Sequence, residues 1–159
     1  MKTTLAIPNY NGAQNIEAII PRVFEENFDA IYVLDDCSDD NSLELLKPFE
    51  SKVNVVRGQK NISAGGNRNR IIDYVKDGII MFLDVDMELL TRNVVEKANE
   101  VFEDEKVALV GGLILNKQGK PMSWNFGPEM HPMHDARASA CNELAEHYSS
   151  NKEILDYIY

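Results

Sequence analysis

The chain has 159 residues, of which 44% are hydrophobic and 26% are charged, a composition typical of a globular domain large enough to bury its own core. Its 26 Asp and Glu side chains exceed its 16 Lys and Arg, and the formal net charge of -10 argues against partners such as nucleic acid or an anionic membrane surface. A phosphorylated small molecule is compatible with this charge if a metal ion or a local basic cluster meets the phosphate.

The sequence shows no internal repeat, linker or low-complexity segment, so we predict a single domain over residues 1–159. Its two cysteines, Cys37 and Cys141, have no paired spacing, which favours reduced thiols. No apolar run approaches the length of a transmembrane helix, and the N-terminus lacks a signal-peptide pattern. These features together lead us to expect a cytoplasmic protein.

Short apolar runs alternate with helical stripes over the first 105 residues. The predicted strands cover residues 3–8, 30–34, 53–56 and 79–83. A predicted helix follows each of them, with apolar positions at 16–24, where Pro21 should bend the helix, and at 43–49, 64–75 and 94–102. Asp39 or Asp40 is the expected cap of the second helix, and Thr91 that of the last. This alternation predicts an α/β fold, a parallel sheet covered by helices through right-handed crossovers.

The pattern changes after residue 105. We predict a fifth strand over 107–115, which Gly111 and Gly112 should bend, then a turn at 116–119 and a return strand over 122–126. A loop and a helix are expected beyond it.

Polar side chains are concentrated where the predicted strands end. Ligands of parallel sheets bind outside the carboxyl ends of the strands, so this one-sided distribution predicts a site at that edge. The residues are Asn9 and Asn11 after the first strand, Asp35 and Asp36 after the second, residues 57–66 after the third, and Asp84 and Asp86 after the fourth.

Asp84 and Asp86 directly follow the most apolar of these runs. Residues i and i+2 of an extended chain point the same way, so the two carboxylates can converge on one ligand. Because like charges repel, a hard divalent cation, Mg²⁺ or Mn²⁺, is the expected partner, completed by phosphate oxygens and water.

Two other clusters have a functional and a structural interpretation. Asp35 and Asp36 can accept hydrogen bonds from a base or a ribose, whereas Asp39 and Asp40 are better explained as helix caps. The segment 61–69 places Gly65 and Gly66 at a helix start with Arg68 and Arg70 in its first turns, which suits an anion. The alternative is a flexible glycine loop with solvated arginines.

Further along, residues 131–135 contain His131, His134 and Asp135, which are candidate metal ligands or a general base, although a plain polar loop explains them better. Trp124 and Phe126 could stack on a sugar, but ordinary packing on a half-buried strand is the favoured interpretation.

Four of these segments together resemble the family 2 glycosyltransferases, which have the GT-A fold, a Rossmann-like and mostly parallel sheet flanked by helices. The matching runs are Ile-Pro-Asn-Tyr-Asn at 7–11, Val-Leu-Asp-Asp-Cys-Ser-x-Asp at 33–40, Asn-x-Ser-Ala-Gly-Gly-Asn-Arg-Asn at 61–69 and Phe-Leu-Asp-Val-Asp at 82–86. They occur in the family's order and spacing and cover residues 3 to 90, which makes them far more specific than any single motif.

The resemblance implies a metal-dependent, inverting transfer of a sugar (a hexosyltransferase type of reaction) from a nucleoside-diphosphate sugar, with a UDP-sugar expected, to a glycan, lipid or protein acceptor. Mn²⁺ or Mg²⁺ would neutralise the charge on the leaving diphosphate. The implied nucleotide-binding residues are Pro8, Asn9, Tyr10, Asp35 or Asp36 (with Asp36 favoured), Arg68 and Asp84, and the implied metal ligands are Asp84 and Asp86. Residues 1–105 would then be the nucleotide-binding half, and 106–159 a partial acceptor-side region.

The sequence departs from the family pattern in three places. Cys37 stands where a small residue is usual in the family. Ile71 stands where a glycine often follows the Arg-Asn pair. The acidic motif that supplies the catalytic base has no convincing copy, so Asp135 and Glu129 are candidates by default. The apolar tail at 154–159 leads us to expect part of a longer enzyme, with the tail covered by further sequence or by a second subunit as a homo-oligomer.

Two alternatives differ in class from an active transferase. A phosphoacceptor receiver domain also combines an acidic pair with a later Asp, but here a complete strand–helix unit precedes the pair and Asp86 is left unexplained. A non-catalytic nucleotide-sugar-binding module would keep the site and lack the base, so turnover would separate it from an enzyme.

Overall fold

The computed structural model describes residues 1–120. The chain divides into two compact units, Met1–Asn99 and Glu100–Tyr159. The elements in chain order are β1 (Thr3–Asn9), α1 (Ala13–Val23), β2 (Ala30–Asp35), α2 (Ser42–Leu46), η1 (Lys47–Phe49), β3 (Asn54–Arg57), α3 (Ser63–Asn69), η2 (Arg70–Asp73), β4 (Ile79–Phe82) and α4 (Val94–Val101).

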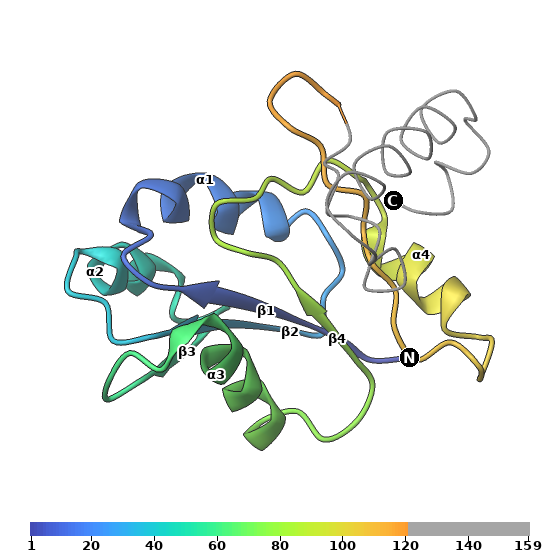
Figure 1. Cartoon of the computed structure of the whole chain (residues 1–159), viewed down its shortest axis with the longest axis horizontal. Helices are drawn as coiled ribbons and strands as arrows, with labels where there is room; N and C mark the ends of the chain where they lie inside the picture. Colours follow the sequence, from blue (N-terminus) through green and yellow to red (C-terminus); the bar gives the residue numbers. More distant parts are fainter. Residues whose placement is uncertain (121–159) are drawn as a thin grey trace, which may run out of the picture. The chain divides into compact units, whose positions relative to one another are not determined.

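The first unit is built on a four-stranded sheet with the strand order β3-β2-β1-β4 (Figure 1). Every strand pair is parallel, and the register places Asn9 of β1 opposite Asp35 of β2, which in turn lies opposite Arg57 of β3. The predicted parallel α/β arrangement is therefore confirmed. Because all four strands run the same way, their carboxyl ends lie at one edge of the sheet.

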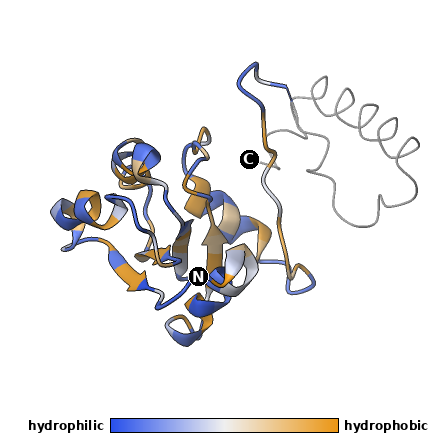
Figure 2. Ribbon diagram, turned by 60° about the vertical axis from the view of Figure 1, so that its left-hand side comes forward, coloured by the Kyte–Doolittle hydropathy of each residue, from blue (hydrophilic) through white to orange (hydrophobic). Residues whose placement is uncertain are grey.

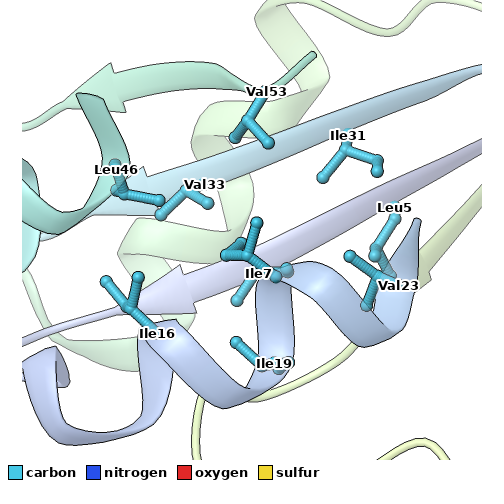
Figure 3. Packing of buried hydrophobic residues seen from close by; sticks show 10 residues of the cluster. Leu5, Ile7, Ile16, Ile19, Val23, Ile31, Val33, Leu46 and Val53 are labelled. Carbon is cyan, nitrogen blue, oxygen red and sulfur yellow. The ribbon is translucent and has the colours of Figure 1, made fainter. Parts of the chain in front are cut away.

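Helices cover both faces of this sheet. Alternate residues of a strand face opposite ways, so Leu5 and Ile7 of β1 pack on one side with Ile16 of α1, Val33 of β2 and Leu46 of α2 (Figure 3). The remaining members of this cluster are Ile19, Ile20, Val23, Ile31 and Val53. Each large side chain buried in this way contributes about 1.5–3 kcal/mol.

The opposite face forms a second, smaller cluster. Ala6 of β1, Leu34 of β2 and Val56 of β3 pack there against Ile71 of η2. Figure 2 shows the helices with hydrophobic and hydrophilic stretches on the same element, as expected of helices with one buried side. The buried side chain of Ile71 thus packs the segment α3–η2 against the sheet.

Some boundaries differ from the predicted ones. The helix expected over 64–75 is a short α3 followed by the 3₁₀ turn η2. Thr91 does not cap α4, which begins at Val94, where the buried Glu26 carboxylate accepts a hydrogen bond from the Val94 N–H at 2.9 Å. Asn93, directly before α4, has a positive φ of 56°. The cap comes from a residue distant in the sequence, and local spacing gave no sign of it.

Over the predicted strand 107–115 the described structure has a single bridge residue, Leu115, and no continuous strand. Gly111 and Gly112 lie in this segment with open space where a Cβ atom would be, and glycine weakens a strand because it offers no side chain to pack. The predicted turn at 116–119 is confirmed, with the Gly119 N–H bonded to the Asn116 carbonyl at 2.8 Å. The expected return strand at 122–126 lies outside the described residues. No helix within residues 1–120 has both the length and the apolar character needed to cross a membrane.

The N-cap residue of α2 is Asn41 rather than Asp39 or Asp40, but Asp40, one residue before it, accepts a hydrogen bond from the first residue of two helices. Its Oδ1 accepts the Ser42 N–H at 3.0 Å, and its Oδ2 accepts the Ala13 N–H at 2.9 Å, so it joins the starts of α2 and α1. Partial burial raises the pKa of Asp40, but the hydrogen bonds from Ser42 and Ala13 outweigh it and lower this pKa below 3.8. Asp39 uses its backbone N–H instead, which bonds to Asn11.

Asp40→Asn should lower the free energy of unfolding by about 1 kcal/mol at pH 7, because one acceptor and the negative charge at two helix starts are lost. Since the folded state lowers the pKa of Asp40, the ionised carboxylate stabilises the fold above pH 3.8, and this contribution is lost as the pH falls below that value. Urea denaturation at pH 7 and pH 3 measures both differences. Asp39→Asn, a change at the neighbouring exposed aspartate, is the matched control and should leave the free energy of unfolding at pH 7 unchanged. An Asp40→Asn deficit of equal size at both pH values would contradict the assignment.

Glu26→Ala should destabilise the first unit by about 1–3 kcal/mol, because the buried Val94 N–H loses its acceptor and Arg22 loses an ion-pair partner. Chemical denaturation measures the change. Glu25→Ala is the control: it removes the neighbouring, more exposed carboxylate that also pairs with Arg22, and should cost at most about 1 kcal/mol. Equal losses in the two variants would refute the capping role.

Candidate functional site

A cavity of about 470 Å³ opens at the edge where the strands end. It lies within the first unit and is lined by the end of β1, the start of α1, the loops that follow the four strands, and α3. Most of the predicted site residues line it, from the end of β1, three separate loops and one helix. They are Pro8, Asn9, Tyr10, Asp36, Arg68, Asp84 and Asp86.

Asp35 is the exception, because its side chain is fully buried and does not line the cavity. Its carboxylate accepts hydrogen bonds from Asn9 Nδ2 at 2.9 Å and from the Ser38 N–H at 3.1 Å. Its backbone carbonyl accepts the Gly58 N–H at 2.7 Å. Asp35 therefore joins the ends of β1, β2 and β3, and of the acidic pair only Asp36 is placed to meet a ligand.

Asp36 is 2% exposed and faces the cavity with its carboxylate already held by protein donors. The Ile62 N–H lies 3.0 and 3.1 Å from its two oxygens, and Arg70 Nη2 lies 3.2 Å from Oδ1. A buried carboxylate needs such compensation. Its remaining lone pairs are suited to accept a hydrogen bond from a ligand.

The loop after β1 is tied to the loop after β2. Ser38 Oγ accepts the Asn11 N–H at 2.9 Å, and Asn11 Oδ1 accepts the Asp39 N–H at 3.0 Å. Asn11 and Cys37 adopt positive φ values of 51° and 66°, an uncommon backbone conformation for residues other than glycine. These contacts fix both loops beside the cavity. The sequence pattern placed Asn11 at this edge but gave no sign of its contacts with Ser38 and Asp39.

Tyr10 is 52% exposed where it lines the cavity, so its ring is available to a planar ligand. Pro8 lines the same cavity from the end of β1. Both residues line the same cavity as the buried Asp36, so the cavity can combine stacking with a polar contact.

Asp84 and Asp86 both line the cavity but differ in their contacts. Residues 84–87 form a turn, closed by the Met87 N–H on the Asp84 carbonyl at 2.9 Å, rather than an extended strand end. Arg68 forms an ion pair with Asp84. Among residues 1–120 no ion pair involves Asp86, which is exposed.

Within residues 1–120 no group of three or more His, Cys, Asp or Glu side chains is gathered to hold a metal ion. A Mg²⁺-type cation is commonly bound through one or two carboxylates, with ligand phosphates and water completing its shell. The exposed Asp86 fits that mode, with Asp84 as a second ligand once Arg68 releases it. The residues present fit a cation shared with a phosphorylated ligand better than one bound by protein alone.

Arg68 and Arg70, which were both expected at the anion site, differ in their position relative to the cavity. Arg68 lines the cavity, as expected of a residue that meets an anion. Arg70 does not line it and donates instead to the backbone of Asp35 and to Asp36. The expectation that both arginines serve one anion site is therefore wrong for Arg70.

The candidates downstream, which are Glu129, His131, His134, Asp135, Trp124, Phe126 and the tail at 154–159, lie outside the described residues. Their roles stay predictions.

Comparison with known proteins places this geometry in a family. The family model described as "Glycosyl transferase family 2" matches residues 4–156. A curated relative, the poly(ribitol-phosphate) beta-N-acetylglucosaminyltransferase TarS of Staphylococcus aureus, is 24% identical over 131 residues, which are 77% of this chain and 23% of that protein. The chain thus spans about a quarter of that relative's length.

Solved structures show the same fold. The structure of S. aureus TarS 1–349 in complex with UDP-GlcNAc superposes with a TM-score of 0.64 and 22% identity over 77% of this chain and 38% of that one. The mannosyltransferase PcManGT from Pyrobaculum calidifontis, in complex with GDP-Man and Mn²⁺, gives a TM-score of 0.59 and 16% identity over 74% of this chain and 36% of that one. The predicted GT-A architecture is confirmed, and the family match over nearly the whole chain shows that this protein belongs to glycosyl transferase family 2.

Proposed function

We propose that this chain provides the nucleotide-sugar site of an inverting, metal-dependent glycosyltransferase. The observation that carries the proposal is that Asp36, Arg68, Asp84 and Asp86, from separate loops and one helix, line a single cavity at the carboxyl edge of the sheet. The match to glycosyl transferase family 2 supports it and leaves the receiver-domain alternative without support.

The donor we propose is a UDP-sugar. Tyr10 and Pro8 would contact the faces of the base, and the Asp36 carboxylate would accept a hydrogen bond from a base N–H, which uracil and guanine both present. The TarS structure in complex with UDP-GlcNAc and the mannosyltransferase structure with GDP-Man support a nucleotide sugar as the ligand. The acceptor we propose is a hydroxyl group of a glycan, a lipid or a protein.

Arg68 and the two aspartates would manage the charge of the diphosphate. Asp86 would hold a Mn²⁺ or Mg²⁺ ion with the ligand's phosphates, and Arg68 would exchange its contact with Asp84 for one with a phosphate oxygen. When bound, the cation would neutralise the negative charge that develops on the departing nucleoside diphosphate.

In the reaction we propose, an acceptor hydroxyl attacks the anomeric carbon as the bond to the diphosphate oxygen breaks, which inverts that carbon. The hydroxyl proton would pass to a carboxylate, and Asp135 is our proposed base, with Glu129 the other candidate. The second possibility is that this chain binds the donor without turnover. One observation favours it: the roles proposed for Asp36, Arg68, Asp84 and Asp86, which line the cavity, all concern binding of the donor.

UDP should raise the melting temperature of the protein only when Mn²⁺ or Mg²⁺ is present, because ligand and cation bind the native state together. At about 100 times its Kd the nucleotide would add about 2.7 kcal/mol of stability. Asp86→Ala should abolish the metal-dependent part, and Asp77→Ala, an exposed aspartate at the opposite end of β4, is the matched control. Thermal shift with and without chelator measures this; an equal UDP shift in both conditions would contradict the metal role.

Arg68→Met should strengthen the binding of Mn²⁺ in the absence of nucleotide by roughly fivefold, because it frees the Asp84 carboxylate and removes a nearby positive charge worth about 1 kcal/mol. The same variant should weaken UDP binding at saturating Mn²⁺, since the phosphates lose a partner. Isothermal titration calorimetry measures both affinities. Weaker Mn²⁺ binding in the nucleotide-free variant would show that Arg68 does not compete with the cation.

A further inference from the structure

We propose that Arg70 is a positioning residue for base recognition: it fixes the Asp36 carboxylate in the orientation that accepts a base N–H, so the selectivity of the site for the base depends on it. This inference rests on the proposed function, because it assumes that Asp36 meets the base. Arg70 itself does not line the cavity and would touch neither the donor nor the reacting atoms.

The guanidinium of Arg70 donates hydrogen bonds to four acceptors around the end of β2. Its Nη1 donates to the Asp35 carbonyl and to Asn67 Oδ1, both at 3.0 Å. Its Nη2 donates to Asp36 Oδ1 at 3.2 Å and to the Lys60 carbonyl at 3.3 Å. The planar, rigid fork of an arginine can meet such a set, which a lysine cannot reproduce.

The acceptors of Arg70 are themselves anchored. Asn67 is 2% exposed and donates its Nδ2 to the Leu34 carbonyl at 2.6 Å, so its Oδ1 is held toward Arg70. Asp35 is buried at the centre of the strand-end network. Arg70 therefore connects the carboxylate of Asp36 to the rigid sheet rather than to a mobile surface.

Gly58 provides the space for this arrangement. A Cβ atom at this position would overlap Nη1, Nη2 and Cζ of Arg70, so the guanidinium lies directly against the backbone after β3. The Gly58 N–H is bonded to the Asp35 carbonyl, which prevents the backbone from moving away easily. Any side chain at this position must displace the guanidinium, so Gly58 offers an independent way to disturb Arg70.

The Asp36 carboxylate is held from one side by these donors. The Ile62 N–H meets both oxygens and Arg70 meets Oδ1, which leaves the lone pairs toward the cavity for the ligand. A carboxylate fixed in this way accepts hydrogen bonds and does not donate them, so it favours the N3–H of uracil over N3 of cytosine, which is itself an acceptor. Without Arg70 the carboxylate would lose its charge partner and its fixed orientation, and the preference would weaken.

The test compares the affinities of UDP and CDP in saturating Mn²⁺, measured by calorimetry. The proteins are the wild type, Arg70→Met, Arg70→Lys, Gly58→Ala, the double variant Gly58→Ala/Arg70→Met, and Arg57→Gln. Arg57 is the matched control, an exposed arginine at the end of β3. Thermal melting of each variant shows that it is folded.

We expect Arg70→Met and Gly58→Ala each to weaken UDP binding about tenfold, which corresponds to about 1.4 kcal/mol, with little change for CDP. The preference for UDP over CDP should then fall by the same factor, Arg70→Lys should lie between, and the double variant should be no worse than Arg70→Met alone, because both changes remove one contact. Arg57→Gln should match the wild type.

A folded Arg70→Met or Gly58→Ala protein that keeps the wild-type preference for UDP over CDP would overturn the inference and leave the proposed function intact. Equal losses of UDP and CDP affinity would also overturn it, because they indicate a general structural role. If Arg70→Met does not fold, Gly58→Ala and Arg70→Lys decide the question by the same ratio. Failure of the wild type to bind any nucleoside diphosphate would instead refute the proposed function, and this inference with it.

Discussion

The buried Asp35 carboxylate and carbonyl hold together the edge of the sheet on which the site is built. Its side chain joins β1 to β2 through Asn9 and Ser38, and its carbonyl receives the Gly58 N–H and Arg70 from the segments after β3. Parallel strands bring their carboxyl ends to one edge, but their loops would be free to move without such bonds. Asp35 removes that freedom, and the neighbouring Asp36 is thereby presented to the cavity.

The rest of the site follows from this anchor in two directions. Toward β3, Arg70 and the Ile62 N–H compensate the charge of the buried Asp36. Beyond the end of β4, Arg68 and Asp84 form an ion pair, and the exposed Asp86 is open to a ligand. The site thus combines a rigid, buried end suited to a flat base with a more exposed, charged end suited to a diphosphate and its cation.

Much of this arrangement could be predicted from the sequence because it depends on local pattern. The apolar runs that form β1 to β4 and the stripe of α1 at Ile16, Ile19 and Val23 are visible as periodicity, and the acidic residues follow the strands at once. The preference for Asp36 over Asp35 came from the family resemblance, and the geometry agrees that Asp36 is the one at the cavity.

The remaining features depend on contacts between residues far apart in the chain. Glu26 caps α4 across 68 residues, and Arg70 reaches Asp36 across 34, so no local spacing could reveal either. The segment 107–115 shows a different departure: its apolar residues predict a strand, but the described structure has only one bridge residue there, Leu115, and the adjacent glycines weaken the tendency to form a strand. The apolar composition of a segment shows that it can form a strand, whereas tertiary contacts decide whether it does.

A crystal structure of this protein with UDP and Mn²⁺ tests the central claim most directly. The account predicts the base between Tyr10 and Pro8 with an N–H on the Asp36 carboxylate, and the cation on Asp86 next to the diphosphate. Nucleotide bound elsewhere, or a cation remote from Asp86 with that side chain facing bulk solvent, would contradict it.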